Sequence, residues 1–597
     1  MYQKSFLTIS LIPFSIILLI TPLIGLSYLN PETNSVMSLD LHQSLKKIAG
    51  QPFTLQATHV LSQESNEESK NVKIVIDDFQ NIHVVWQDND PNYGVVSPNI
   101  FYKRYNPYFG FWSPPEIVSF GSVDYSILPF LATDHLGNIH VTWTERDTSG
   151  YDILYRRWNR VSGSWSSIYN ITSPCNGYSH YSDIVIDNLG NIHVVWEDAS
   201  GYNNTGIDRD IFYRYLPFGS KFWSEIYEIS RSTYECYGPQ ITIDNYNHPH
   251  VVWYENNNPA YGPNYQVVYR TVSSDPRIFD VIHVVSIGNE CGSGDSADPQ
   301  IAFDKVSDLH FSWHQYYGGI DYDILYRKFN IGNSQWSSVF NVSAGTSGYS
   351  THPTLALDKS GNIHVAWEDE FDFNGTGTDY DIFYRFMDNV SLSWSDIMVI
   401  STAASDGDND QMSTLCEITV DTFGHTHFVW SDQENYLGSD VDSDIFYRKL
   451  AAPPLSPVLN PILPNPSLGG VVDLTWNEGL GAFKYYIYRD TNTITSTSTL
   501  TPLAETQMSS FIDREIKNDG TYYYVVIGSN FVGNSSISNC ESVEVINCQT
   551  ISTNTGFSTT TDQEVTGFGY FVLILSFFSV IYIRSNLRSK KRKKMEA

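Results

Sequence analysis

Positive charge is scarce in this chain of 597 residues, which has 35 Lys and Arg against 66 Asp and Glu and a formal net charge of −31. A phosphate backbone is bound mainly by Lys and Arg, so this balance argues against a nucleic-acid partner. Cysteine is scarce as well, and the 6 Cys include no Cys-x-x-Cys pair. A zinc or redox site built on such a pair is therefore not indicated.

Aromatic and β-branched residues are abundant instead. Aromatics make up 14% of the chain, with 40 Tyr, and 41% of the residues are hydrophobic. This composition favours strands and supplies enough apolar surface for a sizeable core. The length is sufficient for two or more domains.

Both ends of the sequence carry apolar segments. Residues 1–28, with Lys4 before a long apolar run, are predicted to be a signal peptide or an N-terminal anchor. Residues 565–583 carry no charge and are long enough for a transmembrane helix. The basic tail 584–597 is expected in the cytoplasm. We therefore expect a single-pass protein of the cell membrane, with its large N-terminal part extracellular and a Ser/Thr-rich stalk at 547–564.

The frame D-x5-H-x2-W recurs seven times within residues 50–450. Successive aspartates lie 57, 53, 57, 60, 54 and 63 residues apart. The aspartates are Asp77, Asp134, Asp187, Asp244, Asp304, Asp358 and Asp421. Three residue types kept in register this often indicate a structural repeat rather than a catalytic motif.

Each repeat contains four short segments rich in β-branched and aromatic residues, separated by turn residues. Four strands repeated seven times predict a seven-bladed β-propeller. The last repeat lacks its fourth segment, while 52–62 precede the first repeat. We expect this N-terminal strand to complete the last blade and close the ring.

The pattern D-x-x-G-N-I-H-V-x-W, followed by D-I-F-Y-R and W-S-x4-I-S, resembles the propeller repeats of sialidase-like proteins with BNR or Asp-box modules. The resemblance covers about residues 50–450. It departs from the strict Asp-box S-x-D-x-G-x-x-W, because Trp196 lies nine residues after Asp187. The resemblance thus implies fold more strongly than activity.

Residues 453–546 resemble a fibronectin type III domain through the segments VVDLTWNEG, KYYIYRD and GTYYYVVIGSN. This family implies a small β-sandwich. The fold expected for the whole chain is thus all-β: a propeller, a sandwich and a C-terminal transmembrane helix.

The recurring residues are interpreted as scaffold. The repeated histidines cannot converge on one metal ion, and each is expected to lie between blades and bond a neighbouring turn. Arg214 and Arg385 are expected to pair with local acids or to lie along the blade. The residues read as structural are Asp187, His193, Trp196, Asp358, His364 and Trp367.

Function is expected on the face where the variable loops emerge, here named the loop face. It carries the loops between second and third strands and the links between blades, whereas the opposite turn face carries short, stereotyped turns. The ligand-face candidates are Tyr178, Tyr181, Tyr202, Tyr237, Tyr317 and Tyr349. Weak candidates for Ca²⁺ are Asp369, Asp379, Asp406, Asp408 and Asp410, although solvated loop acids are the alternative interpretation.

Three functions remain open from the sequence. The first is a membrane-anchored recognition or adhesion protein that binds an extracellular glycan or protein through its propeller. The second is a surface glycoside hydrolase of sialidase-like fold. No arginine cluster of a sialidase is recognisable, and the sequence does not give the distance between acidic residues that would identify the carboxylate pair of another glycosidase. The third is a structural cell-envelope protein. No catalytic residue is assigned.

Overall fold

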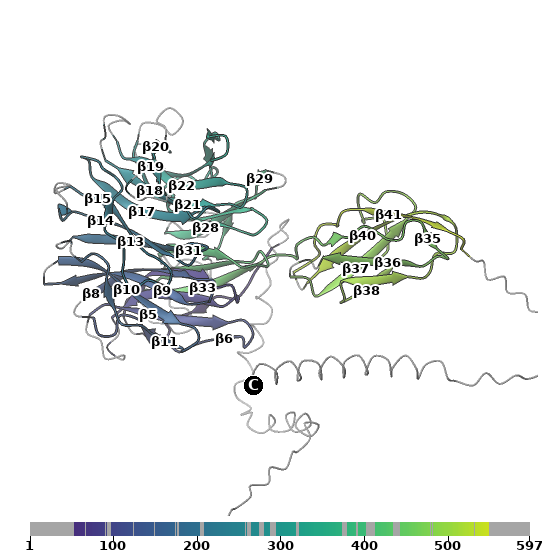
Figure 1. Cartoon of the computed structure of the whole chain (residues 1–597), viewed down its shortest axis with the longest axis horizontal. Coiled ribbons are helices and arrows are strands. Elements are labelled where there is room, and N and C mark those ends of the chain that lie inside the picture. The colour runs from purple at the N-terminus through teal and green to yellow at the C-terminus, as the bar shows by residue number, and fades with distance from the viewer. Residues whose placement is uncertain are drawn as a thin grey trace, which may run out of the picture.

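The computed structural model describes residues 53–548 apart from loop gaps, and this part is built from strands without any helical element (Figure 1). The larger gaps are 92–96, 203–207, 259–263, 287–293, 318–321, 373–378, 402–411 and 434–441. The all-β prediction is confirmed for these residues. None of them forms a helix suited to crossing a membrane, and the expected segments 1–28 and 565–583 lie outside the described residues.

Seven antiparallel sheets of four or five strands make up the N-terminal part, and each is called a blade here. The innermost strands of the blades contact one another in the cyclic order β3, β8, β13, β17, β21, β26, β31 and back to β3. They are β3 (Lys70–Ile76), β8 (Tyr125–Thr133), β13 (Ser179–Ile186), β17 (Cys236–Ile243), β21 (Ser296–Phe303), β26 (Thr351–Leu357) and β31 (Ser413–Val420). The blades therefore form a ring around a central axis.

The second strand of each blade carries the repeated His and Trp. These strands are β4 (Ile82–Asp88), β9 (Ile139–Asp147), β14 (Ile192–Asp198), β18 (Pro249–Glu255), β22 (Asp308–Tyr316), β27 (Ile363–Asp369) and β32 (Thr426–Asp432). The third strands are β5 (Asn99–Asn106), β10 (Gly150–Asn159), β15 (Asp210–Leu216), β19 (Gln266–Thr271), β23 (Tyr322–Asn330), β28 (Asp381–Asp388) and β33 (Asp444–Ala451).

The outer strands are short, and in four of the blades made by the repeats two separate pieces pair with the third strand. These pieces are β6 (Phe111–Trp112), β7 (Glu116–Ile117), β11 (Ser164–Trp165), β12 (Tyr169–Asn170), β16 (Tyr227–Glu228), β20 (His283–Val284), β24 (Gln335–Trp336), β25 (Phe340–Asn341), β29 (Ser393–Trp394) and β30 (Met398–Val399). The sequence predicts one outer strand per blade, and a Ser-containing segment interrupts it in the structure.

The N-terminal strand closes the ring as the sequence predicts. β1 (Thr54–Leu55) and β2 (His59–Val60) pair with β33, the third strand of the last blade. Lys103 of the first blade donates to the carbonyl oxygen of Leu61 over 2.6 Å. The closing segment is thus bonded to both the last and the first blade.

The repeated tryptophans fill the spaces between blades. All seven are less than 2% exposed, and Trp253, for example, packs with Val195 and Ile211 of the preceding blade. Burial of such large apolar side chains is the main favourable contribution to packing one blade on the next.

A second unit follows the ring. Its two sheets have the orders β34-β36-β39 and β35-β41-β40-β37-β38. The strands are β34 (Val458–Leu459), β35 (Ser467–Leu468), β36 (Val472–Asn477), β37 (Lys484–Asp490), β38 (Ala504–Thr506), β39 (Ser510–Asp513), β40 (Gly520–Ser529) and β41 (Glu541–Ile546). Trp476 and Tyr524 lie in the core between the sheets, so this unit is a β-sandwich.

The sandwich is connected on the turn face of the ring. β33 runs from the loop face and ends at Ala451, where it pairs with Thr54. Asn530 of the sandwich donates to the carbonyl oxygen of Ala452 over 3.2 Å. Figure 1 shows the sandwich beyond this end of the ring. The loop face is therefore the free end of the ring.

Candidate functional site at the axis of the loop face

The repeated Asp, His and Tyr form one polar network in each blade, and in four blades the histidine Nε2 also hydrogen-bonds the aspartate. In the third blade, Oδ1 of Asp187 accepts from the backbone N–H groups of Leu189 and Asn191 at 2.9 and 2.7 Å. Nδ1 of His193 lies 2.7 Å from the hydroxyl of Tyr213, and its Nε2 lies 3.4 Å from Oδ2 of Asp187. The network holds the turn between the first and second strands.

The same His–Tyr contact recurs in all seven blades at 2.6–3.0 Å. Each histidine therefore bonds a tyrosine of its own blade, whereas it was expected to bond between blades, and His364 alone among the seven also lies 3.2 Å from the hydroxyl of Thr426 in the next blade. Burial lowers the pKa of His83, His140, His250 and His427. This direction fits a neutral imidazole ring that accepts a hydrogen bond from Tyr at Nδ1 and points its Nε2–H at Asp. The contact with His140 helps to lower the pKa of Asp134 to about 2, although burial alone would raise it.

The repeated arginines bond backbone carbonyl groups rather than acids. Arg214 donates from Nε to the carbonyl oxygen of Ser224 over 2.7 Å and from a terminal nitrogen to that of Ile171 in the preceding blade over 2.5 Å. Arg385 makes the equivalent bonds to Ser395 and Val342. The recurring residues are thus scaffold, but the arginines join neighbouring blades.

Asp369, one of the acids considered for Ca²⁺, belongs to this scaffold. Its carboxylate accepts from Trp367 Nε1 at 2.9 Å and from the hydroxyl of Ser350 at 2.6 Å. Asp379 lies beside a gap in the described residues, and Asp406, Asp408 and Asp410 lie outside them. Within the described part of the chain, no three His, Cys, Asp or Glu side chains are grouped to hold a metal ion.

A β-bulge interrupts every innermost strand near its start on the loop face. The bulge residue always lies six positions before the repeated aspartate and has a positive φ of 45–55°. These residues are Asn71, Leu128, Tyr181, Gly238, Asp298, His352 and Leu415. Six of the seven are not glycine, and such residues rarely adopt this left-handed conformation. Backbone strain of this kind is common at functional sites.

The residue after each repeated tryptophan lies at the same end of the ring as the bulge. These residues are Gln87, Thr144, Glu197, Tyr254, His314, Glu368 and Ser431. In three blades this side chain accepts from the bulge N–H of the next blade: Gln87 from Leu128, Glu197 from Gly238 and Glu368 from Leu415. The two positions therefore form one layer around the axis.

Ionisable and aromatic groups in this layer occur on only four consecutive blades, the third to the sixth. We name this half of the layer the axial mouth. Its residues are Tyr181, Glu197, Gly238, Tyr254, Asp298, His314, His352 and Glu368. The other three blades carry Asn71, Leu128, Leu415, Gln87, Thr144 and Ser431 at these positions. The scaffold is repeated, but the chemistry of this layer is confined to one side of the axis.

His352 joins two carboxylates across the axial mouth. Its Nδ1 lies 3.1 Å from Oε2 of Glu368, and its Nε2 lies 3.5 Å from Oδ2 of Asp298. Burial by itself would lower the pKa of His352, but the hydrogen bond and charge of Glu368 and the charge of Asp298 raise it to about 9. His352 is therefore an imidazolium at neutral pH.

His314 extends this chain of groups. Its Nδ1 has no hydrogen-bond partner and lies 3.4 Å from Oδ2 of Asp298. The rings of His314 and His352 are 6.3 Å apart and nearly perpendicular. Burial lowers the pKa of His314, so the axial mouth contains one neutral and one charged imidazole beside the same carboxylate.

Glu197 occupies the other end of the axial mouth. It accepts from Arg209 at 2.9 Å and from the N–H of Gly238 at 3.0 Å. Burial raises the pKa of Glu197. Burial also raises the pKa of Tyr181, with smaller contributions from the charges of Glu197 and Asp298.

Tyrosine rings flank the axial mouth on two sides. Tyr237 stacks on Tyr254 with ring centroids 5.4 Å apart. On the other side Tyr349 lies 5.2 Å from Tyr322, and Tyr322 lies 5.6 Å from His314. The ligand-face candidates Tyr181, Tyr237 and Tyr349 are therefore brought together here.

The other three tyrosine candidates are placed elsewhere. Tyr202 packs partly buried against the core and lies 6.3 Å from the ring of Phe212. Tyr178 and Tyr317 are exposed on the loop face, by 59% and 39%. Tyr202 therefore serves packing, whereas Tyr178 and Tyr317 remain available to a ligand.

One layer deeper, the residues four positions before the repeated aspartates form a floor that is polar in every blade except the second, which carries Phe130. Lys73 and Glu417 make an ion pair across neighbouring blades, and Thr354 donates to Glu417 over 3.2 Å. Burial raises the pKa of Asp183 to about 6. The ion pair and the hydrogen bond of Thr354 thus lie one layer below the axial mouth.

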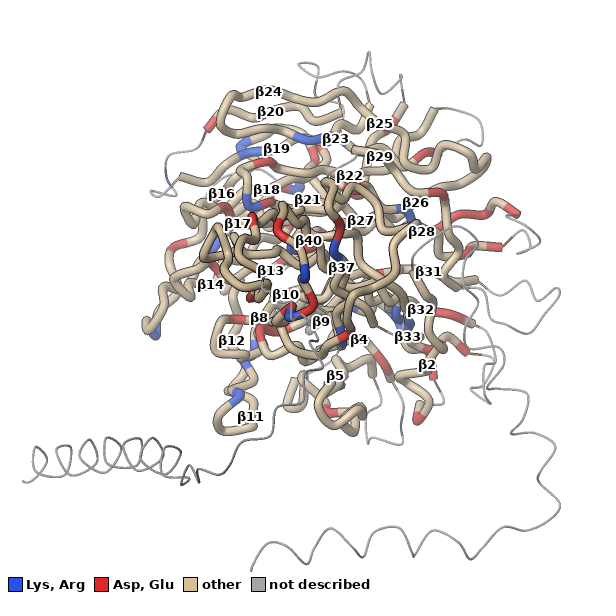
Figure 2. Tube along the Cα trace, turned by 90° about the vertical axis from the view of Figure 1, so that its right-hand side faces the viewer, with Lys and Arg blue, Asp and Glu red and all other residues tan. Residues whose placement is uncertain are grey.

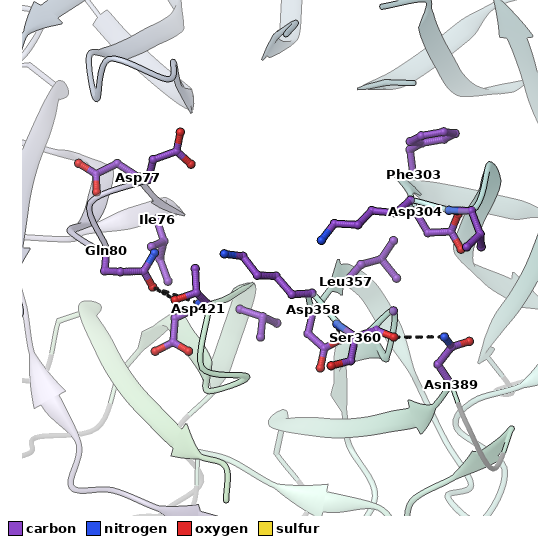
Figure 3. A pocket seen from close by; sticks show the side chains of 17 residues that line it. Ile76, Asp77, Gln80, Phe303, Asp304, Leu357, Asp358, Ser360, Asn389 and Asp421 are labelled. Carbon is purple, nitrogen blue, oxygen red and sulfur yellow. Dashed lines mark hydrogen bonds between the residues drawn. The ribbon is translucent and has the colours of Figure 1, made fainter. Parts of the chain in front are cut away.

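A cavity of about 560 Å³ opens on the turn face (Figure 3). Its walls include the repeated aspartates Asp77, Asp304, Asp358 and Asp421. Figure 3 also shows Asn389 donating to the carbonyl oxygen of Ser360, over 3.2 Å. The carboxylates of these aspartates already accept hydrogen bonds from the backbone of their turns. We therefore interpret this cavity as a consequence of the scaffold.

Asp298, His314, His352, Glu197 and Glu368 were not among the residues predicted from the sequence. The available signal was the register itself, because the position six residues before each aspartate and the position after each tryptophan vary among repeats that are otherwise alike.

No protein-family model and no curated protein matches this sequence. Among solved structures, the chain is similar to a fungal alcohol oxidase of the AA5 family, with 11% identity, coverage of 83% of this chain and 100% of that chain, and a TM-score of 0.43. It is similar to the NanB sialidase of Streptococcus pneumoniae at 10% identity, with coverage of 67% and 70% and a TM-score of 0.36. An ulvan lyase of family PL25 matches at 10% identity, with coverage of 69% and 91% and a TM-score of 0.36. Likenesses at this level do not assign an activity to the chain.

Proposed function

We propose that this protein is a cell-surface recognition protein that binds a glycan at the axial mouth. The observation that carries the proposal is the asymmetry of the bulge layer. Seven blades share one scaffold, yet within this layer only four consecutive blades place acids, imidazoles and tyrosines around the axis. A scaffold requirement would act on all seven positions alike.

The chemistry of the axial mouth suits a polyhydroxylated ligand. Carboxylates and imidazoles supply hydrogen-bond acceptors and donors, and the rings of Tyr254 and Tyr322 supply apolar surfaces. Sugar rings present hydroxyl groups at their edges and C–H groups on their faces. A glycan can use both kinds of group in one site.

The path of the chain supports outward display. Both β1 and β33 reach the turn face, where the sandwich follows. In our proposal the uncharged run 565–583 anchors the protein in the membrane, and 547–564 is a stalk. The loop face then points away from the anchor.

The finer assignments belong to the same proposal. The ring is a seven-bladed β-propeller with sialidase-like repeats, and the sandwich is a fibronectin type III-like spacer. Calcium bound at Asp406, Asp408 and Asp410 would be an accessory ion in this proposal.

The test compares variants of the full-length chain on a panel of immobilised oligosaccharides. Tyr254→Ala should weaken binding of every bound oligosaccharide at least tenfold, and Asp298→Asn should weaken binding of the most tightly bound one at least tenfold, because each removes a group of the axial mouth. The matched controls Asp78→Asn and Tyr246→Ala change exposed residues of the turn face and should leave binding unchanged. Equal binding by mouth and control variants would overturn the proposal.

Glycoside hydrolysis is the second candidate, because Glu197, Asp298 and Glu368 place three carboxylates in the same layer. The same panel decides it when products are analysed. Shortened oligosaccharides that disappear with Asp298→Asn or Glu368→Gln would identify an enzyme.

A further inference from the structure

The axial mouth carries more negative than positive charge. Its carboxylates are Glu197, Asp298 and Glu368, and the cations paired with them are His352 and, beside the axial mouth, Arg209. Three further carboxylates act on tyrosines around it. Besides burial, Asp295 and Glu235 raise the pKa of Tyr265, and Glu370 raises that of Tyr380.

Both cations are already engaged by carboxylates of the axial mouth. Arg209 lies 2.9 Å from Oε1 of Glu197, and His352 lies 3.1 Å from Glu368 and 3.5 Å from Asp298. A ligand carboxylate would have to displace one of these acids and would add negative charge to an acidic site. This arrangement disfavours acidic sugars.

Asp298 is the acid that a ligand can reach. Its side chain is 34% exposed, whereas those of Glu197 and Glu368 are 2% and 4% exposed. Within the described residues, the contacts of Oδ2 of Asp298 are with imidazole nitrogens at 3.4–3.5 Å, beyond the usual length of a charge-assisted hydrogen bond. A stronger donor can therefore be accommodated at this carboxylate.

Aromatic rings add a second attraction for positive charge. The faces of tyrosine rings attract cations, and Tyr181 and Tyr254 lie close enough to Asp298 for its charge to contribute to their raised pKa. The charge of the whole chain, −31, also favours the approach of cations. Figure 2 shows Asp and Glu distributed around the ring.

We propose that the glycan bound at the axial mouth carries a free primary amine, as a deacetylated amino sugar does. Its ammonium group donates to Asp298 and lies near the tyrosine rings, while the sugar ring packs against Tyr254. This inference rests on the proposed function and specifies the substrate class of the same site.

The experiment uses three oligosaccharides of equal length with the full-length chain: glucosamine units, N-acetylglucosamine units and galacturonic acid units. We expect the glucosamine oligosaccharide to bind at least tenfold more tightly than its N-acetylated counterpart at low salt. The galacturonic acid oligosaccharide should bind weakest. The preference for the amine should shrink as salt rises, because screening weakens charge interactions at an open site.

Asp298→Asn is the decisive variant. Asn tolerates the left-handed conformation that Asp298 adopts, so the bulge should be retained. The variant should lose the preference for glucosamine and keep binding of the N-acetylated oligosaccharide. Asp78→Asn, which removes one negative charge from the turn face, should keep the preference of the wild type.

The outcomes separate this inference from the function on which it rests. The proposed preference for an amine would be wrong if the wild type bound the aminated and N-acetylated oligosaccharides equally, or if it bound galacturonic acid most tightly. Either result would leave the proposed glycan binding intact. If Asp298→Asn kept the preference for the glucosamine oligosaccharide, the proposed binding of the amine at Asp298 would also be wrong. Failure of every oligosaccharide to bind would contradict the proposed function itself.

Discussion

At the scale of single residues, one kind of side chain serves two purposes in this protein. The repeated histidines, such as His83, are buried and bonded to a tyrosine and a turn aspartate. His352 lies outside the repeat frame, is half exposed and is held between Glu368 and Asp298. Burial decides the charge of the first kind, and neighbouring carboxylates decide that of the second.

The charge of His352 predicts a pH dependence of stability. Its pKa is about 9 in the folded chain and about 6.5 when unfolded. A raised folded pKa stabilises the protein fully below about pH 6.5, and this contribution is lost as the pH rises through about 9. Denaturant midpoints of the wild type and His352→Asn should differ more at pH 6 than at pH 9.5. A difference that does not change with pH would contradict the ion pairs.

At the scale of elements, the innermost strands combine regular pairing with a bulge. The bulge turns one residue per blade into the left-handed region and places it at the axis. Leu128, with a φ of 53°, shows that the bulge occurs without an ionisable side chain. The bulge is therefore part of the scaffold, and the side chain placed on it determines its use.

Two substitutions of Leu128 should distinguish the contribution of its backbone conformation to stability from that of its side chain. Leu128→Gly should change the free energy of unfolding by no more than about 1 kcal/mol, because relief of the left-handed strain offsets lost packing and added chain entropy. Leu128→Pro should cost about 3 kcal/mol or more, because proline fixes a negative φ and removes the N–H that bonds Gln87. Urea unfolding measures both. Equal stability of the two variants would show that the bulge tolerates a negative φ.

At the scale of the whole molecule, ring closure joins residues far apart in the sequence. The hydroxyl of Ser62 donates to Asp444 over 2.5 Å, and the N–H of Leu61 donates to the carbonyl oxygen of Ile445 over 2.7 Å. Without this segment β33 would be an open edge strand, which is prone to pair with other chains.

Removal of the closing segment should therefore abolish the folded monomer. A chain that begins at residue 64 should aggregate or become sensitive to protease, whereas a chain that begins at residue 50 retains β1 and β2 and should remain monomeric. Size-exclusion chromatography and limited proteolysis measure the difference. A monomeric, protease-resistant chain from residue 64 would show that the ring closes without this strand.

The scaffold was predictable from the sequence because it depends on local register. Repeated Asp, His, Trp and Tyr occur at fixed spacing, and the offset between 52–62 and the last repeat predicted the closing strand. The outer strands were predicted less well, because pieces of two residues carry little pattern. The pairing of the arginines with local acids was wrong, because their partners are backbone carbonyl groups of their own and the preceding blade, which no sequence pattern displays.

The sequence by itself determined an all-β chain of repeats, its closing strand and an acidic, cation-poor surface. Only the tertiary structure decided which varying residues meet. Asp298, His352 and Glu368 lie in different strands and blades, and they come together because the ring brings the start of every innermost strand to one axis. Closure of a ring is a long-range event, so the site that it creates is absent from any single repeat.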